Sequence, residues 1–193
     1  MDTYNLINKL ICGNKRFINN KSNLNNHIAN AIELSKKQKP SIGLICCADS
    51  RVVPEIIFDQ PLGTFLCARI AGNIITPEIL ATMELGINEF KTSLIIVLAH
   101  SNCAAITAAC SNSSQLNYLQ SILKKIKPAI ILTKKSSKKL DLINKISCKN
   151  AKLSVENLKE QSTLIKNCYL KTTTKIVAGF YNIENGLVDF FDS

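Results

Sequence analysis

The sequence lacks any apolar stretch long enough to cross a lipid bilayer. Its longest unbroken apolar run covers residues 94–99, whereas a membrane-spanning helix needs about 20 such residues. Polar side chains at Asp2, Asn5 and Lys9 occupy the region where a secretory signal would need an apolar core. Low-complexity tracts are missing as well, and 46% of the residues are hydrophobic. We therefore expect a single globular domain over residues 1–193, cytoplasmic and not bound to a membrane.

Arginine is scarce in a chain that is otherwise strongly basic. The formal net charge is +10, yet only three of the 24 basic residues are arginines, at positions 16, 51 and 69. The lysines are spread over many segments without interleaved aromatic residues, which favours a solvated lysine-rich surface over a nucleic-acid-binding face. Because arginine offers a planar pair of donors that lysine cannot imitate, the three arginines mark positions where that geometry is needed.

Histidine is also rare, whereas cysteine is not. The chain has two histidines, His27 and His100, and eight cysteines. In a reducing cytosol cysteines serve as free thiols, metal ligands or core residues, so we expect no structural disulfide. His27 is interpreted as a solvent-facing residue, which leaves His100 as the candidate for chemistry.

Short segments that are apolar on both faces predict the strands of a parallel sheet covered by helices. These are residues 41–46, 65–70, 93–98 and 175–180. Helices are expected at residues 6–17, 28–37, 77–90, 104–110, 116–126 and 152–167. The alternation predicts a three-layer α/β/α domain with a mainly parallel central sheet, preceded by an N-terminal helical arm over residues 1–38.

Two segments with metal-binding side chains begin where predicted strands end. The first is CCADSR at 46–51 and the second is HSNC at 100–103. Sites in open parallel sheets form at the carboxyl ends of strands, so His100 and Cys103, three residues apart, can converge on one metal ion. The third ligand is Cys47 or Cys46, of which only one can face the site, because adjacent strand residues point to opposite faces.

Two thiolates and one imidazole with an open fourth position are typical of a catalytic zinc centre. The spacing of His100 and Cys103 alone is weak evidence for a metal site, since His100 could equally be a core histidine and Cys103 a buried thiol. The residues Asp49-Ser50-Arg51 strengthen the zinc interpretation. A carboxylate held by a guanidinium stays ionised and acts as a fixed hydrogen-bond acceptor.

These residues resemble the β-class carbonic anhydrases, whose patterns Cys-x-Asp-Ser-Arg and His-x-x-Cys are matched by residues 47–51 and 100–103. The resemblance extends to residues 8–21, 58–73 and 175–190 and is weakest over 111–150. It implies reversible hydration of carbon dioxide to bicarbonate and a proton, and a homodimer or tetramer. It also implies one Zn2+ per chain, with Cys47, His100 and Cys103 as its ligands.

The resemblance further assigns roles around the metal. It implies that Asp49 accepts a hydrogen bond from the attacking oxygen and that Arg51 orients Asp49, while Ser50 and Gly72 are expected to contact substrate. Gly72 is also expected to adopt a backbone conformation closed to other residues. Members regulated by bicarbonate carry a tryptophan in their effector pocket, and this chain has no tryptophan. The unregulated type is therefore expected.

Three positions depart from the family's usual pattern. Ala99 and Ala104 stand where the family has glycines, and Thr64 stands where an acidic residue is common. An added methyl beside the metal is expected to narrow the pocket or shift the start of the helix. Two alternatives therefore stay open: a carbon disulfide hydrolase-like enzyme of the same fold, and a non-catalytic zinc protein that binds nucleic acid.

Overall fold

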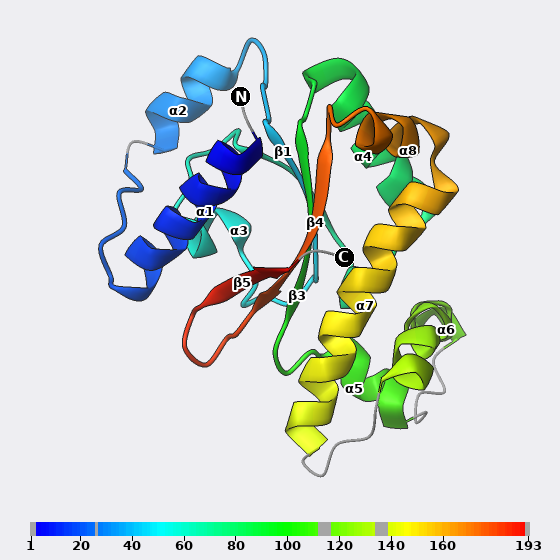
Figure 1. Cartoon of the computed structure of the whole chain (residues 1–193). Coiled ribbons are helices and arrows are strands. Elements are labelled where there is room, and N and C mark those ends of the chain that lie inside the picture. The colour runs from blue at the N-terminus through cyan, green and yellow to red at the C-terminus, as the bar shows by residue number, and fades with distance from the viewer. Residues whose placement is uncertain (1–2, 26, 112–116, 134–138, 192–193) are drawn as a thin grey trace.

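A single mixed sheet forms the centre of the computed structural model, which describes residues 3–25, 27–111, 117–133 and 139–191. Its strand order is β2-β1-β3-β4-β5 (Figure 1). The first four strands run parallel, and the last pairs antiparallel with β4. The strands are β1 (Ile42–Cys46), β2 (Phe65–Arg69), β3 (Leu94–His100), β4 (Lys175–Tyr181) and β5 (Val188–Phe191).

Helices cover both faces of the sheet. α1 and α3 lie on one face, α4, α7 and α8 lie on the other, and α5 and α6 lie beyond the carboxyl end of β3 (Figure 1). This arrangement confirms the predicted three-layer α/β/α class. The helices are α1 (Thr3–Ile18), α2 (His27–Leu34), α3 (Pro54–Ile57), the 3-10 turn η1 (Ala71–Asn73), α4 (Pro77–Phe90), α5 (Ala104–Ser111), α6 (Asn117–Leu132), α7 (Lys139–Gln161) and α8 (Thr163–Leu170).

Two of the three inner strands, β1 and β3, are apolar on both faces because both faces are covered. Every residue of β1 and β3 is buried. Along β1, Leu44 packs in the core beneath α1, whereas Ile45 packs in the core beneath α4 and α7. Each fully buried leucine or isoleucine contributes about 1.5–3 kcal/mol relative to an exposed one. Core packing therefore fixes the register that places the strand ends together.

The four predicted strands are confirmed to within two residues, but two helix predictions are wrong in their extent. The single helix predicted over 152–167 is two helices, because Ser162 Oγ accepts a hydrogen bond from the Ile165 amide (3.1 Å) and so caps a new helix, α8. α7 also begins earlier, at Lys139, in a stretch where lysine, aspartate and asparagine obscure the apolar positions. α6 continues past Pro128 to Leu132 instead of ending at residue 126.

None of the helices within the described ranges is both long and apolar enough to span a membrane. The start of α4 follows the predicted pattern. Thr76 Oγ1 accepts a hydrogen bond from the Ile79 amide (3.4 Å), and Pro77 occupies the first turn of the helix.

Candidate metal centre

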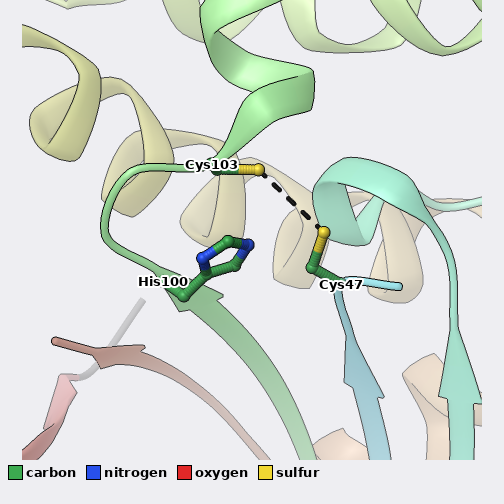
Figure 2. A group of neighbouring side chains, drawn as sticks. All are labelled: Cys47, His100 and Cys103. Carbon is green, nitrogen blue, oxygen red and sulfur yellow. Dashed lines mark hydrogen bonds between the residues drawn. The ribbon is translucent and has the colours of Figure 1, made fainter. Parts of the chain in front are cut away.

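The structure brings together Cys47, His100 and Cys103, and all three residues are buried. Cys47 follows β1 directly, His100 is the last residue of β3, and Cys103 directly precedes α5. Because β1 and β3 are neighbouring parallel strands, their carboxyl ends deliver the first two side chains to one point. The three side chains face one another, with donor atoms all within 4.8 Å (Figure 2).

The adjacent cysteines at the end of β1 point to opposite sides of the sheet. Cys47 Sγ lies 4.0 Å from Cys103 Sγ. Cys46 Sγ lies instead 3.9 Å from Cys67 Sγ, on the side of the sheet that α1 covers. The structure therefore places Cys47, and not Cys46, beside His100.

The three donors fit a zinc ion. Two sulfur atoms bonded to one tetrahedral zinc at about 2.3 Å lie about 3.8 Å apart, close to the 4.0 Å between Cys47 and Cys103. His100 Nδ1 lies 2.8 Å from the Ser101 carbonyl oxygen, which can only accept, so Nδ1 carries the proton. Nε2 then presents a lone pair, and it is buried without a hydrogen-bond partner. Zinc would satisfy that nitrogen.

The surroundings of the two thiols favour ionisation of Cys47. A hydrogen bond from Cys103 is the largest influence that lowers the pKa of Cys47, and the Gly72 amide acts in the same direction against the effect of burial. The Gly72 N–H donates to Cys47 Sγ at 3.4 Å. The same pairing with Cys47, together with burial, raises the pKa of Cys103. The site thus presents a thiolate, which is the form that binds a metal.

Asp49 lies beside the three donors and is held by Arg51. Arg51 Nε and Nη2 donate to Oδ1 and Oδ2 of Asp49 at 2.9 and 2.8 Å, and the Arg51 amide donates to Oδ1 at 3.0 Å. These bonds lower the pKa of Asp49 to about 2. Asp49 Oδ2 is 4.0 Å from His100 Nε2. An ionised acceptor therefore faces the metal position.

Arg69 and Asn102 complete this arrangement, although neither has a predicted role in it. Arg69 Nη2 donates to the Asp49 carbonyl at 2.8 Å, and its Nε donates to the Cys47 carbonyl at 3.4 Å. The Asn102 carbonyl accepts from Arg51 Nη2 at 3.5 Å. The scarcity of arginine marks Arg69 in the sequence, whereas no signal in the sequence marks Asn102.

The structure also locates the two expected substrate contacts and the two alanines that replace the family's glycines. Ser50 is exposed, next to Asp49. Gly72 has a φ of 72°, as expected, and its amide donates to Cys47 Sγ. Ala99 is buried in the core beneath α4 and α7, so its methyl packs against the core rather than the metal. Ala104 is exposed as the first residue of α5.

Two further residues named from the sequence lie away from the metal centre. Thr64 is half-buried and donates through Oγ1 to the Pro61 carbonyl at 2.9 Å. His27 is exposed as the first residue of α2. Neither residue belongs to the group formed by Cys47, His100 and Cys103.

Comparison of the sequence with known proteins identifies the family of this chain. Residues 42–188, well over half of the chain, match the family model described as carbonic anhydrase. The chain belongs to the β-class carbonic anhydrases. This is a family of enzymes that depend on zinc and hydrate carbon dioxide.

Carbonic anhydrases of known sequence and structure resemble most of this chain. The carbonic anhydrase of Mycolicibacterium smegmatis is 29% identical over 182 residues, covering 92% of this chain and 87% of that protein. The structure of the β-carbonic anhydrase CcaA superposes with a TM-score of 0.77 at 26% identity, over 98% of this chain and 92% of that one. Two tetrameric β-carbonic anhydrases from Sordaria macrospora are described together, and the matching chain has a TM-score of 0.77 at 19% identity and covers 98% of both chains. This last match bears on the fold alone.

Proposed function

We propose that this chain is a zinc-dependent carbonic anhydrase that converts carbon dioxide and water reversibly into bicarbonate and a proton. The observation that carries this proposal is the buried Cys47, His100 and Cys103 group beside an ionised Asp49. Bound at this position, zinc would supply a Lewis acid that makes a water molecule acidic enough to act as a nucleophile near neutral pH. Membership of the family gives the reaction class.

In this proposal, Cys47, His100 and Cys103 hold the metal, and the Ser101 carbonyl fixes the tautomer of His100. This hydrogen bond also keeps the imidazole from rotating, which is how second partners of metal-binding histidines usually act. These three residues complete the set of protein ligands, and the fourth coordination position is left for water or substrate.

Asp49 orients the attacking water in this proposal. Its carboxylate can only accept, so the water oxygen must turn an O–H toward Asp49 and a lone pair toward carbon dioxide. Arg51 bonds to both carboxylate oxygens and so keeps Asp49 from binding the metal itself. Arg69 holds the same loop from β2 through the carbonyls of Cys47 and Asp49. Ser50 and Gly72 are proposed to border the substrate.

The pair Cys46 and Cys47 provides a test with an internal control. We expect Cys47→Ala to lose bound zinc and carbon dioxide hydration together, since it removes one of three ligands. Cys46→Ala should keep both, because its sulfur lies on the far side of the sheet against Cys67. Zinc content by elemental analysis and stopped-flow hydration assays measure the two effects. A Cys47→Ala protein that retains zinc and activity contradicts the ligand assignment.

The same purified protein separates the alternative functions. Sulfide release from carbon disulfide at a rate comparable to carbon dioxide hydration would indicate the related hydrolase activity instead. Tight, salt-sensitive binding to unrelated DNA or RNA, without hydration activity, would indicate a zinc protein that binds nucleic acid. We expect neither result.

We also propose that the chain forms a homodimer or tetramer in the cytoplasm. α2 has no buried residue, and its Ile28 and Ile32 side chains are 74% and 67% exposed. Burial of this face against a second copy, with residues 1–38 as the arm, would remove that apolar surface from water. All eight cysteines are free thiols, which suits a reducing compartment. Light scattering of wild type and Ile28→Asp tests the assembly, and cell fractionation tests the location.

A further inference from the structure

Two buried polar side chains on the inner face of α7 are unexplained by the site described above. Asn150 and Ser154 are each only 3% exposed. They are four residues apart and so share one face of the helix. Their neighbours Ala151, Val155 and Leu158 pack in the apolar core. Burial of an amide and a hydroxyl in such surroundings is unfavourable unless both are hydrogen bonded.

Both side chains bond to η1, the 3-10 turn at Ala71–Asn73. Asn150 Nδ2 donates to the Gly72 carbonyl at 2.8 Å, and Ser154 Oγ donates to the Asn73 carbonyl at 3.2 Å. Gly72 and Asn73 have φ values of 72° and 43°, and the left-handed conformation is unfavourable for a non-glycine residue such as Asn73. α7 therefore bonds to two successive carbonyls of η1. These bonds help to hold a turn whose φ values the backbone alone does not favour.

That turn makes a direct contact with the metal centre. The Gly72 N–H donates to Cys47 Sγ at 3.4 Å. A Cβ at Gly72 would approach Ile126 Cδ1 to 2.9 Å, so the turn is also tightly packed against α6. The direction of the Gly72 N–H depends on the orientation of η1, which Asn150 fixes through the carbonyl of the same residue.

α7 reaches the second ligand-bearing loop in a similar way. Asn144 Oδ1 accepts a hydrogen bond from the Asn102 amide at 3.2 Å. Asn102 lies between His100 and Cys103 and has a φ of 55°. One helix, far from both loops in the sequence, thus bonds to the backbone on both sides of the metal position.

We propose that Asn150, supported by Ser154, is a positioning residue of the metal centre. Its hydrogen bond to Gly72 holds η1 so that the Gly72 amide donates to the Cys47 sulfur, which fixes the direction of the sulfur lone pairs and reduces the charge on the thiolate. This inference rests on the proposed function in that Cys47 is taken as a zinc ligand. Loss of comparable outer partners weakens metal binding or activity about 10- to 100-fold.

The test compares zinc binding by Asn150→Asp and Asn150→Ala with that of wild type. Asn150→Asp keeps the volume of the side chain but places an oxygen where the donor to Gly72 was. Asn157→Ala is the matched control, because Asn157 lies two turns further along α7 and is half-buried. Zinc dissociation constants are measured by competition with a chromophoric chelator. The sulfur-to-cobalt charge-transfer band of the cobalt-substituted protein reports on the thiolate, and thermal unfolding of the metal-free protein reports on the fold.

Both Asn150 variants are expected to bind zinc about 10- to 100-fold more weakly than wild type and to shift the cobalt band, while Asn157→Ala matches wild type in both. Unchanged zinc affinity, or weakened affinity with an unchanged band, overturns the proposal. Should the Asn150 variants not fold, Ser154→Ala provides the same comparison with a smaller expected change. A wild type that binds zinc but does not hydrate carbon dioxide contradicts the proposed function and leaves this comparison valid.

Discussion

Arg51 holds Asp49 by both carboxylate oxygens, and this pairing fixes the direction of the carboxylate beside the metal position. Lysine has the same charge but only a single ammonium, so it cannot bond both oxygens in one plane. Lysine makes up 21 of the 24 basic residues of the chain. Arg51 therefore supplies geometry in addition to charge.

Replacement of Arg51 by lysine tests that difference. We expect Arg51→Lys to keep its zinc, because none of the three donors changes, and to lower kcat about 10- to 100-fold, as outer partners of metal sites commonly do. Zinc analysis and steady-state hydration kinetics measure the two quantities. Arg16→Lys alters an arginine that pairs with Asp59 instead of Asp49 and should leave kcat near wild type. Equal kcat in Arg51→Lys and wild type would show that the two-pronged pairing is not needed.

The strands, and the two loops that bring Cys47 and Cys103 close to His100, could be predicted from the sequence. Strands covered on both faces read as continuous apolar runs, and His100 and Cys103 are close in sequence. Alternation along a strand says that Cys46 and Cys47 differ in direction but not which one faces the site. The resemblance to the family pattern selected Cys47, and its sulfur lies in the group with His100 and Cys103. The bond from Asn150 to Gly72 joins residues 78 apart, and no local pattern in a single sequence encodes such a partner.

The break between α7 and α8 shows how one side chain ends a helical pattern. Ser162 is 2% exposed, accepts from the Ile165 amide at 3.1 Å and donates through Oγ to Glu84 Oε1 at 2.6 Å. It thus begins α8 and ties it to α4. The apolar spacing continues across this position, which explains why the sequence pattern predicted one helix.

Ser162→Ala is expected to lower the free energy of unfolding by about 1–2 kcal/mol, the usual effect of losing an N-cap with a serine side chain. The loss should lie toward the upper value, because Glu84 also loses its partner. Urea denaturation followed by circular dichroism measures the change. Ser121→Ala, at an exposed serine whose side chain bonds only within its own helix, should change stability by less than about 0.5 kcal/mol. A similar small change in Ser162→Ala would mean that the cap has no role in the break.

α1 joins parts of the chain that lie far apart in sequence. The buried Asn14 donates through Nδ2 to the carbonyls of Ile57 and Gly186, and its Oδ1 accepts from the Val188 amide at 3.0 Å. A Cβ at Gly13 would lie 1.8 Å from the Phe58 carbonyl oxygen, so only glycine permits this approach of α1 to α3. The first helix is thereby fixed to the sheet and to the β4–β5 hairpin, whereas α2 is left exposed.

Asp59 provides a second attachment of the N-terminal region, and it makes stability depend on pH. Burial alone would raise the pKa of Asp59, but hydrogen bonds from Ser22, Arg16 and the Asn23 amide outweigh it and lower the pKa below its ordinary value. Because the pKa is lower in the folded protein, this carboxylate stabilises the fold fully above the unfolded pKa of about 3.9 and loses that effect as pH falls toward the folded pKa.

We therefore expect Asp59→Asn to lower the free energy of unfolding by about 3 kcal/mol at pH 7, comparable to breaking a buried ion pair. In asparagine, an NH2 group replaces one carboxylate oxygen, and this group would face one of the donors that bond to Asp59, namely Arg16, Ser22 or the Asn23 amide. The difference between variant and wild type should stay constant from neutral pH down to about pH 4 and shrink below it, since protonated Asp59 no longer gains from Arg16. Urea denaturation at a series of pH values measures this dependence. A difference that stays the same down to pH 2.5 would show that the charge of Asp59 does not anchor the N-terminal region.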